Sequence, residues 1–148
     1  MHVVIWTLGD NRFATPTRDV VEAISVVDVR SLPSVDPWVC GLINYRGRPI
    51  PLVDVSKLLG EGTAKRQLYA RILVVKRGAE SETEWLGLLV ESVLGAESLD
   101  FDSAETAPTD TLPPQIPFLG PISLFDRGSI QLTDSSKIPI TPNPASNL

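Results

Sequence analysis

The sequence is poor in the residues that most enzymes use for catalysis. It has one histidine, His2, and one cysteine, Cys40. A general base must be positioned beside its substrate, and a catalytic thiol needs a base to activate it, so neither residue predicts an active site. We expect Cys40 to be a small buried apolar residue, as free cysteines usually are. A single cysteine also excludes an internal disulfide.

Positive charge and long apolar runs are scarce as well. The 148 residues include 13 Lys and Arg against 18 Asp and Glu, which gives a formal net charge of -5. Binding to nucleic acid or to an anionic membrane needs a basic face. No apolar run reaches the roughly 18–20 residues of a membrane span, and the start, MHVVIWTLGD, lacks the features of a signal peptide. We therefore expect a cytoplasmic protein that binds no nucleic acid and does not insert into the membrane.

Motifs that bind phosphate or metal are missing too. The chain has no Gly-rich phosphate loop, no nucleophile elbow and no cluster of Cys and His for zinc. Glu80, Glu82 and Glu84 would share one face of a strand, but a solvated loop explains them better than a calcium site. The prediction is a protein with no catalytic residues, no metal site and no cofactor.

Short apolar runs separated by turn residues make up most of the chain, which is typical of a β barrel or sandwich. These runs cover residues 3–8, 25–32, 42–46, 49–55, 71–76, 85–90, 93–99, 122–125 and 130–133. Residues 18–24, after Thr17, fit either a short helix or a strand, and we leave both open. One helical turn is expected at residues 56–59, and Gly95 should interrupt the run that contains it.

Prolines and polar residues mark the predicted loops. Residues 78–82 are expected to join two strands as a hairpin loop, and residues 101–121, with five prolines, should form one long loop. A domain is predicted over residues 1–135, followed by a disordered tail at 136–148. Pro49 and Pro51 cannot donate to a ladder, so their strand should lie at a sheet edge or begin irregularly.

Residues 41–54, GLINYRGRPIPLVD, place a charged turn between two apolar strands. Gly47 tolerates positive φ, so the chain can turn sharply there. Arg46 could offer its guanidinium to a partner, or pair within the chain with Asp54 or Glu22. We keep these roles open for Arg46. Asp54 is expected to accept backbone N–H bonds from the helical turn that follows it.

This stretch resembles the signature of the CheW family, in which a glycine, an asparagine, an Arg-Gly pair, a proline and a final aspartate are set in apolar surroundings. The likeness covers about residues 3–135. Its other parts are the Val20-x-Glu22 segment, the later hairpin at 71–93 and the closing hairpin at 120–133. The resemblance implies a nearly all-β fold with minor helix, built as two SH3-like five-stranded barrels.

The resemblance also implies a function. Proteins of this family are non-enzymatic adaptors that join the cytoplasmic tips of chemoreceptors to the regulatory domain of a CheA-type histidine kinase, in arrays at the inner membrane. Arg71 lies close to where family members contact the receptor tip, and Val20 could belong to the core or to an interface. On this resemblance the predicted partner-binding residues are Val20, Glu22, Arg46, Gly47 and Arg71, and the predicted structural residues of the corner are Gly41, Pro51 and Asp54.

Several departures keep other functions open. Arg71 stands where apolar residues are commoner, and the prolines at 108–121 and after residue 138 put the family's closing helix in doubt. These features leave room for a divergent adaptor in another pathway, such as pilus motility or second-messenger control. Three further alternatives are an SH3-like module for proline-rich peptides, which the 6% aromatic content disfavours, an enzyme with an unrecognised carboxylate pair, and a regulatory domain of a larger kinase. The start at Met1 and the apparent tail speak against the last.

Overall fold

The structure is a computed structural model and describes residues 1–33, 36–63, 65, 67–77, 84–101, 116–125 and 128–140. In these residues short strands dominate and helices are limited to single turns. The elements are β1 (His2–Leu8), β2 (Asn11–Pro16), the 3-10 helix η1 (Thr17–Asp19), β3 (Val20–Ser25), β4 (Val39–Tyr45), β5 (Arg48–Asp54), α1 (Val55–Leu58), β6 (Arg71–Lys76), β7 (Trp85–Val90), β8 (Ser92–Ser98), β9 (Leu119–Phe125), β10 (Gly128–Thr133) and the 3-10 helix η3 (Ser135–Lys137).

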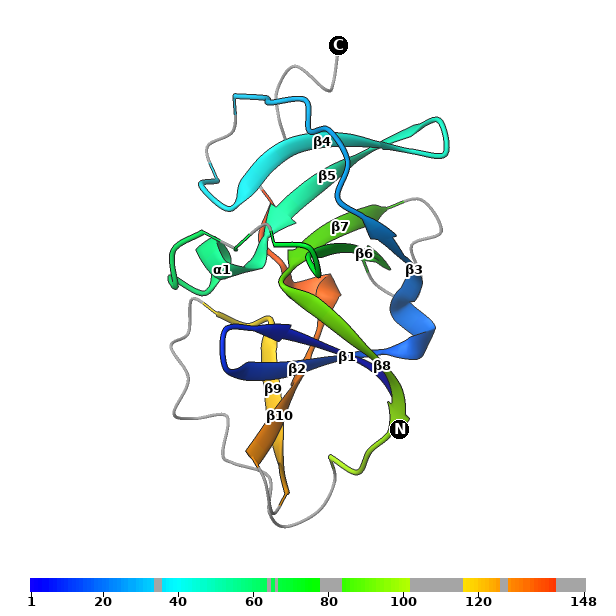
Figure 1. The fold of residues 1–148 in the computed structure, drawn as a ribbon, viewed down its shortest axis with the longest axis vertical. Coiled ribbons are helices and arrows are strands. Elements are labelled where there is room, and N and C mark those ends of the chain that lie inside the picture. The colour runs from blue at the N-terminus through cyan, green and yellow to red at the C-terminus, as the bar shows by residue number, and fades with distance from the viewer. Residues whose placement is uncertain are drawn as a thin grey trace.

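The described strands form two five-stranded sheets. The first, which we call the continuous unit, takes β3 to β7 from one stretch of chain in the order β3-β6-β7-β5-β4. The second, the split unit, combines the first two strands with the last three in the order β8-β1-β2-β10-β9. Each contains one parallel pair, β5 with β7 and β10 with β2. Figure 1 shows the continuous unit above the split unit. The nearly all-β fold of two five-stranded units predicted from the family resemblance is confirmed.

One hydrophobic core joins the two units. Trp6 and Phe13 of the split unit belong to the same cluster of buried side chains as Leu73 and Leu88 of the continuous unit. The rings of Trp6 and Phe13 are stacked with centroids 4.7 Å apart, and Trp6 Nε1 donates to Thr15 Oγ1 at 2.9 Å. A buried indole needs such an acceptor. The shared core therefore fixes the two units against each other.

Most of the predicted strands are confirmed within a few residues. The open segment 18–24 contains both alternatives in part, since η1 occupies Thr17–Asp19 and β3 begins at Val20. The predicted helical turn is α1, and the interruption at Gly95 is a break in the register of β8 with β1. The predicted run at 25–32 is wrong beyond β3, because its later residues form only one isolated bridge, from Arg30 to Leu42.

The prolines of β5 do not place the strand at an edge. β5 lies inside its sheet, between β7 and β4. Arg48 pairs with Tyr45 next to the turn, so Pro49 and Pro51 occupy the alternate positions whose backbone nitrogens face away from β4. On that other side the ladder with β7 starts only at Leu52. The edge prediction is wrong for the strand, although its first half has a partner on one side only.

The boundaries of the two proline-rich segments also differ from the prediction. β9 begins at Leu119, so strand structure starts inside the expected loop at 101–121, and Phe118 just before it is fully buried. The tail predicted from residue 136 does not begin there, because Ile138 is fully buried in the main core. Arg77 Nη2 donates to Ile138 O at 2.9 Å, and Trp38 Nε1 donates to Pro139 O at 2.7 Å. The loop expected at 78–82 lies outside the described residues, as do residues 102–115 of the loop expected at 101–121 and residues 141–148 of the tail expected at 136–148.

The connection between the units at η1 contains a buried carboxylate. Asp19 is 9% exposed, and burial raises the pKa of its carboxyl above the ordinary value of 3.8. The negative charge of Asp134 raises this pKa further, whereas Arg18 and Lys76 lower it. A raised pKa means that the folded state disfavours the ionised carboxylate more than the unfolded state does.

This leads to a pH-dependent prediction for Asp19→Asn. Above the raised pKa the wild-type carboxylate is ionised in both states, so the variant should have the larger free energy of unfolding. As the pH falls through the raised pKa to the ordinary value of 3.8 the wild-type carboxyl becomes protonated, and the difference should shrink towards zero. Urea unfolding at a series of pH values measures it. Asp10→Asn, at an exposed turn, removes the same charge as a control, and equal pH profiles for the two variants would contradict the prediction.

Candidate partner-binding surfaces

The Arg-Gly corner is a two-residue turn between β4 and β5. Arg46 and Gly47 have φ values of 50° and 79°, and both central residues of a type I′ hairpin turn need positive φ. Asn44 Oδ1 accepts the Gly47 N–H at 2.8 Å. Arg46 is the only residue other than glycine with positive φ among those the structure describes. Such local strain persists only where surrounding contacts hold it.

Glu22 supplies one of those contacts. Its Oε2 accepts hydrogen bonds from the Tyr45 hydroxyl and from Arg46 Nη2, the latter at 2.9 Å. Of the two internal partners considered for Arg46, the structure therefore selects Glu22 and not Asp54. β3 and β4 are opposite edges of the sheet, so these bonds link the two edges of the continuous unit. We call Glu22, Tyr45 and Arg46 the corner clasp.

An irregularity in β3 orients Glu22. The register of β3 with β6 shifts between Val20 and Glu22, as in a β-bulge, which places an extra residue in one strand and changes the direction of a side chain. Val20 and Val21 are partly buried and pack against the main core. Val20 thus contributes to core packing, whereas the Glu22 side chain, two residues later, extends to Tyr45 and Arg46 at the turn.

Aromatic rings and a second arginine extend the corner. Tyr45 lies edge-on to Trp85, with ring centroids 5.9 Å apart. The Arg46 guanidinium carbon is 5.3 Å from the Tyr45 ring centre, and that of Arg48 is 4.4 Å from the Trp85 ring centre, distances at which cations and rings attract. The hydrogen bond to Glu22 is the main cause of a raised pKa for the Tyr45 hydroxyl. The Arg46 side chain remains 74% exposed, so its charge is accessible.

The residues expected to be structural include two that lie away from the turn, near the other end of the β4–β5 hairpin. Gly41 has a φ of 148°, and a Cβ built on it would lie 2.2 Å from Arg30 O. Asp54 precedes α1, and its Oδ1 accepts the N–H groups of Ser56 and Lys57 at 3.0 and 3.4 Å. Asp54 is only 1% exposed, which fits a capping side chain and not a contact at the surface.

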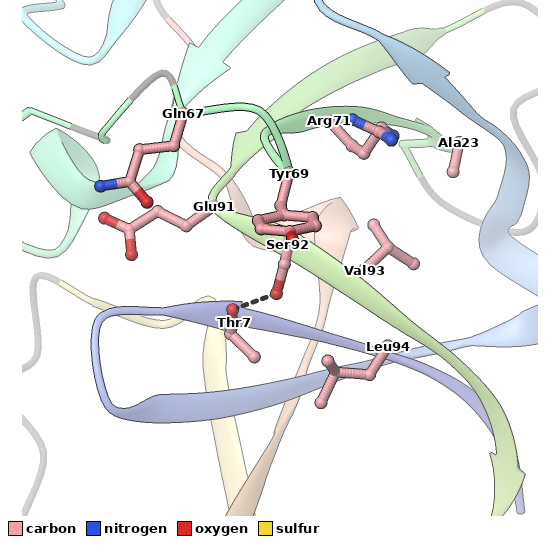
Figure 2. A pocket seen from close by; sticks show the side chains of 9 residues that line it. All are labelled: Thr7, Ala23, Gln67, Tyr69, Arg71, Glu91, Ser92, Val93 and Leu94. Carbon is pink, nitrogen blue, oxygen red and sulfur yellow. Dashed lines mark hydrogen bonds between the residues drawn. The ribbon is translucent and has the colours of Figure 1, made fainter.

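A second surface lies where the two units meet. An open groove of about 620 Å³, which we call the junction groove, is drawn in Figure 2. Its walls come from β1 and β8 of the split unit and from β3, the start of β6 and the residues before it in the continuous unit. The lining residues are Thr7, Ala23, Gln67, Tyr69, Arg71, Glu91, Ser92, Val93 and Leu94. Tyr69 and Leu94 are 68% and 57% exposed, and the nearby Leu68 is 84% exposed.

Arg71 lies in this groove, apart from the corner clasp. Its Nη1 donates to Leu68 O at 3.0 Å and to Ala70 O at 2.8 Å. These bonds hold the turn that presents Leu68 and Tyr69 to solvent. The structure thus separates the predicted contact residues into two groups, and β3 connects them because Ala23 of the groove directly follows Glu22 of the clasp.

Sequence reasoning missed several residues of both surfaces. Tyr45, Arg48 and Trp85 at the corner, and Tyr69 and Leu94 in the groove, were not singled out. The sequence could not indicate that Glu22 accepts a hydrogen bond from Tyr45, because the two residues lie on strands at opposite edges of the sheet. Exposed apolar residues have no sequence signal of their own, since the same residues occupy the core.

The remaining residues considered in the sequence analysis lie outside both surfaces or outside the described residues. Cys40 is partly buried and packs against the main core, and His2 is exposed at the start of β1. Glu80 and Glu82 lie outside the described residues. Within the ranges that are described, no three His, Cys, Asp or Glu residues are placed to hold a metal ion. In the same ranges no helix has the length and apolar character needed to cross a membrane.

Comparison with known proteins identifies the family. The model of the CheW-like domain matches residues 2–139, and the chain belongs to this family. It is 31% identical over 110 residues to protein PilI of Pseudomonas aeruginosa, an alignment that covers 74% of this chain and 55% of PilI. It is 25% identical to protein FrzA of Myxococcus xanthus, over 74% of this chain and 61% of FrzA. It is also 29% identical to chemotaxis protein CheW of Thermotoga maritima, over 63% of this chain and 58% of that protein.

A solved structure supports the fold. The scaffolding protein TtCheW from Thermoanaerobacter tengcongensis superposes with a TM-score of 0.74 at 23% sequence identity, over 89% of this chain and 87% of that one. The curated relatives extend beyond the match, since the chain spans little more than half the length of each of the three.

Proposed function

We propose that this protein is a non-enzymatic adaptor of a bacterial chemosensory array. In this proposal it works in the cytoplasm, at arrays on the inner membrane, and couples the cytoplasmic tips of chemoreceptors to the regulatory domain of a CheA-type histidine kinase. The observation that carries the proposal is the presence of two separate accessible surfaces, the corner clasp and the junction groove, on a domain of the CheW-like family. An adaptor needs two such surfaces so that both partners can be bound together.

The two surfaces suit different partners. The corner presents the exposed guanidinium of Arg46, backed by Tyr45, and is suited to a folded domain that offers a carboxylate. The junction groove exposes Tyr69 and Leu94 with Arg71 beside them. An apolar groove with flanking charges suits an amphipathic helix, such as a receptor tip. We assign the kinase domain to the corner and the receptor tip to the groove.

Each contact is expected to be modest in affinity, because an array assembles through many simultaneous weak contacts.

A role in a pathway other than flagellar chemotaxis is the second candidate function. Two similar proteins, PilI and FrzA, have names other than chemotaxis protein, and Arg71 introduces a charge into the groove. A divergent adaptor would use the same two surfaces with other receptors and another kinase.

The test is a calorimetric titration against the regulatory domain of each CheA-like kinase in the same genome. Wild-type protein should bind one of them with micromolar affinity, and Arg46→Ala should weaken binding by about tenfold, equivalent to about 1.4 kcal/mol. The stability of Arg46→Ala should change little, since an exposed ion pair contributes about 0–1 kcal/mol.

Arg12→Ala serves as the matched control, because it removes the same charge from an exposed position of β2 in the other unit. Equal affinities of the two variants would remove Arg46 from the interface, and a folded wild-type protein that binds none of the domains would overturn the adaptor proposal.

Glu22→Lys is a less specific test, since Glu22 accepts the partly buried hydrogen bond of the Tyr45 hydroxyl. Losing this bond to a charged group should also cost about 1.5–3 kcal/mol of stability.

A further inference from the structure

Glu91 lies where the chain crosses from the continuous unit to the split unit, between β7 and β8. Its Oε2 accepts the backbone N–H of Gly9 at 2.6 Å, and its Oε1 accepts the backbone N–H of Lys65 at 3.4 Å. Its own N–H donates to Thr7 O at 3.0 Å. Both carboxylate oxygens and the backbone are therefore used to hold neighbouring segments.

The two N–H groups bound by this carboxylate belong to different units. Gly9 is in the turn between β1 and β2 of the split unit, and Lys65 is in the connection between α1 and β6 of the continuous unit. That connection leads directly to Gln67 and Tyr69, which line the junction groove together with Glu91 itself. Figure 2 shows Glu91 and Gln67 on one side of the Tyr69 ring. One side chain that lines the groove thus bonds to a segment of each unit next to it.

A carboxylate is well suited to this role. Charged acceptors make stronger hydrogen bonds to backbone N–H groups than neutral ones do, and two oxygens allow two donors to be held together. Lys65, whose N–H it accepts, comes three and four residues before Leu68 and Tyr69, which are 84% and 68% exposed and so gain little from burial in the free protein. Ordering such a segment only when a partner binds would weaken that binding.

We infer that Glu91 is a positioning residue that holds the junction groove in the shape that accepts an apolar helical segment. The inference rests on the proposed function, because it takes the groove as the site of the receptor tip. It adds that affinity at this site depends on a residue that acts through the neighbouring backbone, and not only on the apolar side chains that face the ligand.

The experiment compares Glu91→Ala, Glu91→Gln and the control Glu97→Ala. Glu97 is exposed on β8, the strand that follows Glu91, so its replacement removes the same charge without affecting these hydrogen bonds. The probe is a soluble helical fragment of the cytoplasmic tip of a chemoreceptor from the same genome, titrated by calorimetry. Hydrogen exchange of the backbone amides of Gly9, Lys65 and residues 67–70 is measured on each free protein.

Glu91→Ala should bind the fragment about tenfold more weakly than Glu97→Ala, and its amides at these positions should exchange faster. Glu91→Gln retains one acceptor oxygen and should recover part of both effects. Equal affinities for Glu91→Ala and Glu97→Ala would overturn the inference, as would weaker binding with unchanged exchange, which would make Glu91 a direct contact. A wild-type protein that does not bind the fragment would instead overturn the assignment of the groove, and the exchange data would show separately whether Glu91 orders its walls.

Discussion

Gly41→Ala is expected to lower the free energy of unfolding by about 3–5 kcal/mol, from the combined cost of a strained backbone and an overpacked site. The added Cβ would lie 2.2 Å from Arg30 O, 2.9 Å from Arg30 C and 3.0 Å from Ser31 Cα. The two backbone segments cannot move apart to make room for the Cβ, because Arg30 and Leu42 exchange backbone hydrogen bonds of 2.8 and 2.9 Å. Urea unfolding followed by tryptophan fluorescence measures the loss.

Gly47→Ala is the matched control, since Gly47 also has positive φ but nothing lies within 4 Å of the Cβ position. It should cost only the strain of a left-handed residue, about 1–2 kcal/mol. If the two variants were equally stable, close approach of the chain at residues 30 and 31 would not be the reason for a glycine at position 41.

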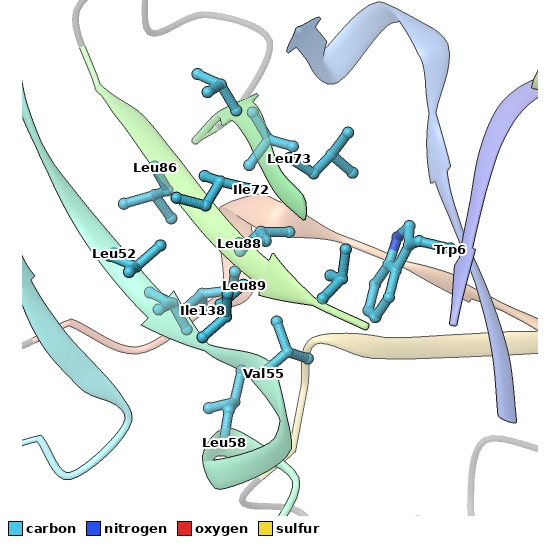
Figure 3. Close-up of a cluster of buried hydrophobic side chains, with 14 of the residues drawn as sticks. Trp6, Leu52, Val55, Leu58, Ile72, Leu73, Leu86, Leu88, Leu89 and Ile138 are labelled. Atoms are coloured by element: carbon cyan, nitrogen blue, oxygen red, sulfur yellow. The ribbon is translucent and has the colours of Figure 1, made fainter. Parts of the chain in front are cut away.

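Ile138→Ala is expected to cost about 2–5 kcal/mol, as for other large residues removed from a close-packed core. Ile138 is fully buried although it follows the last strand. Figure 3 shows it among the core side chains of the continuous unit, near Leu52 and Leu89. β10 belongs to the split unit, so the Ile138 side chain, which follows it, packs the end of the split unit against the core of the continuous unit. Thermal and urea unfolding both measure the effect.

Leu68→Ala provides the comparison, because it removes a similar volume from a side chain that is 84% exposed. It should change stability by less than about 0.5 kcal/mol. A similarly small effect for Ile138→Ala would mean that the chain after β10 contributes nothing to the folded domain, and the boundary predicted at residue 135 would then hold.

The local features of the corner could be read from the sequence, whereas its long-range contacts could not. Positive φ at Gly47 and capping by Asp54 depend on residues within a few positions, so the residue types suffice to predict them. The choice of Glu22 over Asp54 as the partner of Arg46 depends on how the sheet closes. That arrangement brings β3 and β4 together from opposite edges of the sheet, with Glu22 and Arg46 24 residues apart in the chain, and no short-range pattern encodes it.

Proline content misled the prediction on both sides of the hairpin of β9 and β10. Prolines suggested that residues 101–121 are one loop and that the chain is disordered after residue 135, yet Leu119 starts a strand and Ile138 is buried. A proline constrains φ and removes a donor, but it does not prevent the apolar residue beside it from packing. The fold of two β units was predictable because strand periodicity and the family resemblance agreed.

The split unit has a consequence for the order in which the protein is built. During synthesis β3 to β7 leave the ribosome as one stretch, and the continuous unit can complete its sheet at once. β1 and β2 are made first but must wait for β10, which pairs with β2 and comes more than a hundred residues later. Pairing over such a distance is slow, and chains that wait with unpaired edges are prone to aggregation. The main core is complete only after Ile138 has been made, so a nascent chain cannot form its finished partner surfaces until nearly the whole domain has been synthesised.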